Sequence, residues 1–114
     1  MDFLGLRPRV PSSFPHTPVQ LLTPSLEQAF RRFPLQSQDG LGDDALVVCA
    51  FFDPSGRYTF YATEGAPVGR GDWEFFGYCL SPLGDDCDEW GSVTLSELRS
   101  IRGRLGLGIE RNTS

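Results

Sequence analysis

The residue types that most often carry out catalysis are scarce in this chain of 114 residues. It contains one histidine, His16, and three cysteines, Cys49, Cys79 and Cys87. A Cys–His or Ser–His–Asp nucleophilic system would have to use His16. That residue lies in a proline-rich stretch, whereas general-base catalysis needs a rigidly positioned side chain. We therefore expect no catalytic residue.

The same residues fit a metal site poorly. His16 and the three cysteines formally supply four zinc ligands, but structural zinc sites show close ligand pairs and the nearest cysteines here are eight positions apart. Cys49 and Cys79 also lie within apolar runs, where a thiol usually behaves as a small buried hydrophobe. We expect neither a metal nor a cofactor.

A cluster of four carboxylates, Asp85, Asp86, Asp88 and Glu89, is the densest group of charge in the chain. Oxygen ligands suit Ca²⁺ and Mg²⁺, but the cluster lacks the spacing and the central glycine of a calcium-binding loop. A solvated acidic loop is the simpler interpretation.

The acidic charge is concentrated in the middle of the sequence. The net charge is −5, but residues 35–98 hold only two arginines against twelve acidic residues. Such a block repels nucleic-acid phosphates and attracts basic surfaces. We therefore predict a basic protein partner rather than direct nucleic-acid or membrane binding. The predicted contact residues are Asp72, Glu74, Asp85, Asp86, Asp88 and Glu89.

An alternative hypothesis is a small enzyme whose site combines Glu64, Tyr61, Arg102 and Glu110. It requires a pocket with convergent polar groups, which the sequence does not show.

The elements that must position these residues follow from local patterns. Residues 1–18 contain four prolines and predict an arm, followed by one domain over residues 19–114. Thr23 and Pro24 favour a helix start, helical apolar spacing continues to Phe33, and Pro34 ends it. Residues 45–52 and 57–63 flank a type I turn at residues 53–56 and predict an antiparallel hairpin with a central first strand.

Further elements are expected towards the C-terminus. Residues 64–72 indicate a glycine-rich loop, residues 73–80 and 90–94 two strands, and residues 105–111 an edge strand. Gly77 indicates a bulge or close backbone contact. Thr94 or Ser96 caps a short helix that ends at Gly103. The fold class is therefore α+β, an antiparallel sheet of four or five strands with two short helices.

The cellular setting is inferred from what the sequence lacks. Three cysteines cannot all pair with one another, and we find no signal-peptide pattern and no apolar run of about 20 residues. We expect a cytoplasmic protein.

Eight short motifs give the chain a resemblance to the bacterial family called domain of unknown function 2958. That resemblance implies a plasmid or integrated mobile-element setting and no established activity. The motifs, in order, are LLTP (21–24), FFDP (51–54), FYATEG (60–65), FFG (75–77), LSEL (95–98), IRG (101–103), LGL (105–107) and IER (109–111).

These observations together favour a non-enzymatic interaction protein of a mobile element or phage. Small size, missing catalytic residues and an acidic stretch suit an inhibitor of a host defence complex, of the anti-CRISPR or anti-restriction type. An accessory subunit of a plasmid maintenance or transfer system is a further alternative.

Overall fold

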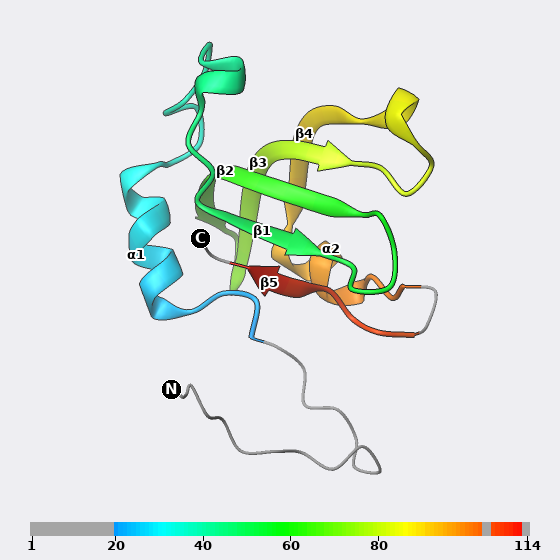
Figure 1. Ribbon diagram of the computed structural model, residues 1–114. Coiled ribbons are helices and arrows are strands. Elements are labelled where there is room, and N and C mark those ends of the chain that lie inside the picture. The colour runs from blue at the N-terminus through cyan, green and yellow to red at the C-terminus, as the bar shows by residue number, and fades with distance from the viewer. Residues whose placement is uncertain (1–19, 104–105, 113–114) are drawn as a thin grey trace, which may run out of the picture.

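The computed structural model describes residues 20–103 and 106–112. Its centre is a five-stranded antiparallel sheet in the order β4-β3-β2-β1-β5 (Figure 1). Two helices accompany the sheet, which confirms the predicted α+β class. The strands are β1 (Cys49–Phe52), β2 (Thr59–Val68), β3 (Asp72–Leu80), β4 (Glu89–Thr94) and β5 (Glu110–Asn112).

The first helix, α1 (Pro24–Arg32), begins as its sequence predicts. The hydroxyl of Thr23 accepts a hydrogen bond from the backbone N–H of Leu26 at 3.2 Å, and Pro24 occupies the first turn. Since the first N–H groups of a helix have no partner within it, this cap satisfies one of them.

The second helix, α2 (Leu95–Ser100), has a reciprocal cap. The Thr94 hydroxyl accepts from the Glu97 N–H at 3.1 Å, and the Glu97 carboxylate accepts from the Thr94 N–H at 2.8 Å. This capping box decides between the two predicted caps in favour of Thr94. The helix ends at Ser100, three residues before the predicted end at Gly103. Gly103 lies outside the helix and donates its N–H to the Leu107 carbonyl.

The predicted hairpin is present between β1 and β2. Phe51 pairs with Phe60 and Cys49 with Ala62, so the first strand begins at Cys49 rather than at residue 45. In the connecting turn the Gly56 N–H donates to the Asp53 carbonyl at 3.2 Å. β1 lies between β2 and β5, which confirms its central position, and β5 forms one edge of the sheet.

The glycine-rich loop predicted at residues 64–72 is wrong, because β2 continues to Val68. Residues of this segment pair with β3, Gly65 with Phe75 and Val68 with Asp72. A register shift between Ala62 and Glu64 lets the strand bend and continue. Local glycine and proline content indicated a loop, but pairing with β3 satisfies the backbone and outweighs that preference.

Gly77 fulfils its predicted role as a point of close backbone contact. It pairs with Ala62, and a Cβ at this position would overlap the Tyr61 carbonyl oxygen. Only glycine therefore lets β3 approach the bent part of β2 so closely.

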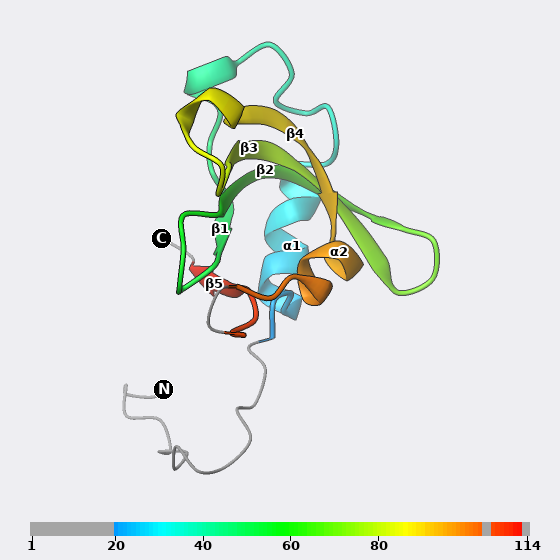
Figure 2. The same cartoon turned by 90° about the vertical axis from the view of Figure 1, so that its right-hand side faces the viewer.

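One face of the sheet carries the core. Phe30 of α1 packs against Trp73 and Phe75 of β3, with ring centroids 6.2 and 5.1 Å apart, and Leu95 and Leu98 of α2 belong to the same buried cluster. Both helices therefore lie on this side of the sheet, as Figure 2 shows.

Some predictions fall outside the described part of the chain. The proposed arm at residues 1–18, which includes His16, lies there, as does residue 105, the first of the predicted last strand. Within the described residues, neither helix has the length and apolar character needed to cross a membrane.

Candidate protein-interaction surface

The four clustered carboxylates lie together on the connection between β3 and β4. This connection contains a short 3₁₀ helix, η2 (Asp85–Cys87), and Asp88 and Glu89 follow it directly. Asp85, Asp86 and Glu89 are exposed, and the Asp85 side chain retains 92% of its accessible surface. This part of the predicted contact set is therefore a compact group that faces solvent.

Asp88 has a different role from its neighbours, because its carboxylate is engaged within the protein. Arg57 donates to both of its oxygens at 2.7 Å, and the Ser81 N–H donates to Oδ1 at 2.8 Å. Only 9% of the Asp88 side chain is exposed. Asp88 thus fixes the acidic connection to the end of the β1–β2 hairpin.

The titration of this pair reflects the same contacts. The hydrogen bond from Arg57, aided by the Ser81 N–H, lowers the pKa of Asp88 from 3.8 to about 2. The hydrogen bond to Asp88 in turn raises the pKa of Arg57 above its ordinary value. Arg57 also contacts Asp85 at 2.9 Å, so the connection is held by a charged network that persists across the neutral pH range.

The remaining two predicted contact residues, Asp72 and Glu74, lie at the beginning of β3. Asp72 accepts hydrogen bonds from the Trp73 N–H at 2.8 Å, the Ser96 N–H at 3.0 Å and the Ser96 hydroxyl at 2.9 Å. The hydrogen bond from the Trp73 N–H, and after it the one from the Ser96 hydroxyl, stabilises the carboxylate and lowers the pKa of Asp72. Asp72 therefore links β3 to the first turn of α2.

The six predicted contact residues do not form one continuous surface. Asp72 is the first residue of β3 and Glu74 the third, whereas Asp85 to Glu89 follow the other end of that strand. The two groups therefore lie near opposite ends of this nine-residue strand, whose first and last residues are roughly 26 Å apart at the usual rise per residue. We therefore define the acidic connection as residues 85–89 and treat Asp72 and Glu74 separately.

Glu64, the main residue of the alternative enzyme site, is buried with 2% of its surface exposed. Its two oxygens accept the backbone N–H groups of Gln36 at 2.6 Å and Gln38 at 2.9 Å. The buried Gln38 side chain then bonds Leu46 and Thr63, donating to both carbonyls and accepting from the Leu46 N–H. We name this arrangement the Glu64 clamp, since it holds the segment between α1 and β1 against β2.

The other members of that alternative site do not gather around Glu64. Arg102 is exposed and donates to the carbonyls of Arg99 and Ile101 beside it. Tyr61 pairs with Tyr78 on β3, and Glu110 pairs with Phe52 at the β5 edge. The four residues of the alternative site therefore lie in different elements of the fold and do not converge on one point.

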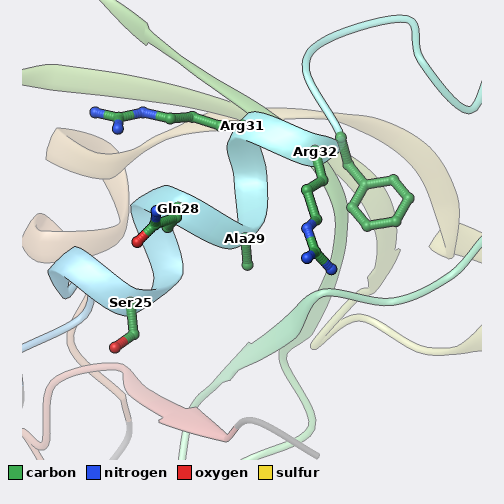
Figure 3. A pocket seen from close by; sticks show the side chains of 6 residues that line it. Ser25, Gln28, Ala29, Arg31 and Arg32 are labelled. Atoms are coloured by element: carbon green, nitrogen blue, oxygen red, sulfur yellow. The ribbon is translucent and has the colours of Figure 1, made fainter.

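A shallow groove follows the exposed side of α1, and none of those four residues lines it (Figure 3). Arg31 and Arg32 project from the last turn in different directions, so their guanidinium groups do not converge. Catalytic pockets usually gather several polar groups around one point. The groove is lined by Ser25, Gln28, Ala29, Arg31, Arg32 and Phe33.

The cysteines are also dispersed. Cys49 is buried, Cys79 is half-buried and Cys87 is exposed, and burial raises the pKa of the Cys49 thiol to about 12. Among residues 20–103 and 106–112, no three His, Cys, Asp or Glu side chains are grouped as metal ligands would be.

The sequence interpretation missed an aromatic cluster on the sheet face opposite the core. Trp90 of β4 stacks on Phe76 of β3, with centroids 5.8 Å apart and planes inclined by 16°, and meets the edge of Tyr78 at 5.4 Å. The signal was present in residues 73–80, where aromatic residues occupy both alternating positions. An ordinary half-buried strand would have polar residues at every second position.

Comparison with known proteins identifies the family. A family model described as a protein of unknown function (DUF2958) matches residues 21–114. The chain belongs to this family. The match confirms the resemblance found in the motifs, and its range includes both helices and all five strands that the structure describes in this chain. No curated protein and no solved structure gives a significant match.

Proposed function

We propose that this protein is a non-enzymatic inhibitor, encoded by a bacterial mobile element or phage, that binds a basic protein of a host defence complex. The observation that carries this proposal is the acidic connection. Asp85, Asp86 and Glu89 present exposed carboxylates on a segment that the Asp88–Arg57 ion pair holds in place. A fixed set of negative charges loses less conformational entropy on binding than a mobile one does.

The proposed mechanism is competition for a nucleic-acid-binding groove. Such grooves in defence nucleases of the CRISPR or restriction type bind phosphates through lysine and arginine. Carboxylates at fixed positions offer the same sign of charge to those side chains, and they accelerate association by electrostatic steering. The inhibitor would then exclude the nucleic acid without any chemical step.

The first experiment is affinity purification of the tagged protein from a bacterial host, with mass spectrometry of the retained proteins. A triple variant, Asp85→Asn, Asp86→Asn and Glu89→Gln, removes the exposed charges of the acidic connection. A matched triple variant, Asp39→Asn, Asp43→Asn and Asp44→Asn, removes three exposed charges from the segment before β1.

We expect the first variant to lose the captured partner and the second to retain it. Binding of the wild type should weaken as ionic strength rises from 50 to 500 mM. Over this range the Debye length falls roughly threefold, so exposed charges are screened more strongly. Partner capture that is equal in both variants and insensitive to salt would contradict the proposal.

A further inference from the structure

The sheet has a second face whose side chains the helices do not cover. In β3 the residues Trp73 and Phe75 point to the core, so Phe76 and Tyr78 must point to the opposite side. Tyr78 pairs with Trp90 on β4 and with Tyr61 on β2, so all three share that side. We name Tyr61, Phe76, Tyr78 and Trp90 the aromatic face.

The aromatic face is partly open to solvent. Trp90 remains 38% exposed although it contacts both Phe76 and Tyr78, and the other three residues are half-buried. Both α1 and α2 pack on the opposite side of the sheet (Figure 2). An open aromatic cluster in a small domain commonly marks an interaction site.

Negative charge lies near both ends of this face. Glu74 alternates with Phe76 along β3 and therefore lies on the same side, and at the other end of β3 Asp85 and Asp86 lie on the connection that leads to Trp90. Glu89 pairs with Cys79 and so points to the core side of the sheet. Arg57 is also at this end, but its guanidinium is engaged by Asp88 and Asp85. Aromatic rings bordered by carboxylates are complementary to cations, and they disfavour the phosphates of a nucleic acid.

We propose that the aromatic face binds an arginine-containing segment of the partner, with a guanidinium group placed on the Trp90 ring and bonded to the exposed carboxylate of Asp85 or Asp86. This proposal rests on the proposed function and specifies the chemistry of its partner. Arginine fits better than lysine, because a planar guanidinium stacks on an aromatic ring while its edge donates to a carboxylate. A compact, strongly hydrated ammonium group has no such geometry.

The test measures binding of two fluorescein-labelled peptides by fluorescence anisotropy, one of alternating arginine and glycine and one of alternating lysine and glycine. The protein variants are Trp90→Leu, which keeps an apolar side chain but removes the ring, and Trp90→Phe, which keeps a ring. Leu83→Ala is the matched control, since Leu83 is an apolar residue between β3 and β4 and is 83% exposed. Circular dichroism verifies that each variant is folded.

We expect the arginine peptide to bind the wild type more tightly than the lysine peptide. Trp90→Leu should weaken arginine-peptide binding by about tenfold, the effect of losing one partly desolvated cation–π contact. Trp90→Phe should retain part of that affinity, and Leu83→Ala should retain all of it.

Three results would overturn this inference. The first is equal binding of both peptides with Trp90→Leu unchanged, which leaves a purely electrostatic inhibitor and so preserves the proposed function. The second is the absence of binding by either peptide. The third is a concentration-dependent dimer in sedimentation analysis that Trp90→Leu dissociates, because the face would then bind a second copy of this chain.

Discussion

The Glu64 clamp and the acidic connection use the same functional group in opposite ways. Glu64 is 2% exposed, and each of its oxygens accepts a backbone N–H from the segment before β1. The Asp85 side chain is 92% exposed and meets one arginine. The first carboxylate has its hydrogen-bonding capacity engaged within the fold, whereas the second leaves most of its capacity for water or a partner.

The difference shows that a carboxylate's role here depends on what surrounds it. Asp88 and Asp72 are intermediate cases, since each is hydrogen-bonded within the protein but lies close to the surface. Removing these groups one at a time should therefore give a graded loss of stability. The largest loss should occur at Glu64 and the smallest at the exposed residues Asp85, Asp86 and Glu89 of the acidic connection.

The largest effect is expected from Glu64→Ala. This change leaves the N–H groups of Gln36 and Gln38 without their acceptor, and Gln38 is itself buried. Unsatisfied buried donors cost about 1–3 kcal/mol each, so we expect the free energy of unfolding to fall by about 3 kcal/mol. Urea denaturation measures the free energy of unfolding, and Asp86→Ala, at an exposed carboxylate, is the control. Equal losses in both variants would contradict the distinction between the two regions.

The second effect concerns Asp88 and depends on pH. Its pKa is about 2 in the folded protein against an ordinary 3.8, so the contribution to stability is present above about pH 4 and is lost as pH falls through 2. Asp88→Asn should be less stable than the wild type at pH 7, and the gap between them should close towards pH 2. Thermal unfolding at several pH values measures this gap, and a gap independent of pH would contradict the assignment.

A smaller effect is expected from Asp72→Asn. The contacts with Trp73 and Ser96 lower the pKa of Asp72, so its stabilising contribution is also present at neutral pH and decreases in acid. The loss should be local to the first turn of α2, because Ser96 supplies two of the donors. Faster amide hydrogen exchange at Ser96, with the β1–β2 hairpin unchanged, is the expected result. Uniformly faster exchange would show that Asp72 supports the whole fold instead.

The smallest effect on stability is expected from the triple variant of the acidic connection, Asp85→Asn, Asp86→Asn and Glu89→Gln. These side chains are exposed, and substitutions at such positions usually change stability little. The melting temperature should stay within about 4 °C of the wild type. A much larger fall would mean that these carboxylates also hold the fold, and any loss of partner binding could not then be assigned to contact.

Elements with local signals are already specified by the amino-acid sequence. Thr23 and Pro24 begin α1, Thr94 and Glu97 begin α2, and residues 53–56 form the turn of the β1–β2 hairpin. Each of these features depends on residues within four positions of one another, so the chain specifies them before it folds. The central position of β1 follows from the apolar run at residues 45–52, which has no polar face.

The roles of the charged and aromatic residues, in contrast, depend on contacts between distant parts of the chain. The hydrogen-bond partners of Glu64 are 26 and 28 positions away in the sequence, and Asp72 and Glu74 lie at the opposite end of β3 from the acidic connection. Pairing with β3 turned a glycine-rich segment into the second half of β2 and brought Phe76, Tyr78 and Trp90 together. Such contacts depend on strand register, and register is set by the packing of the whole sheet rather than by neighbouring residues.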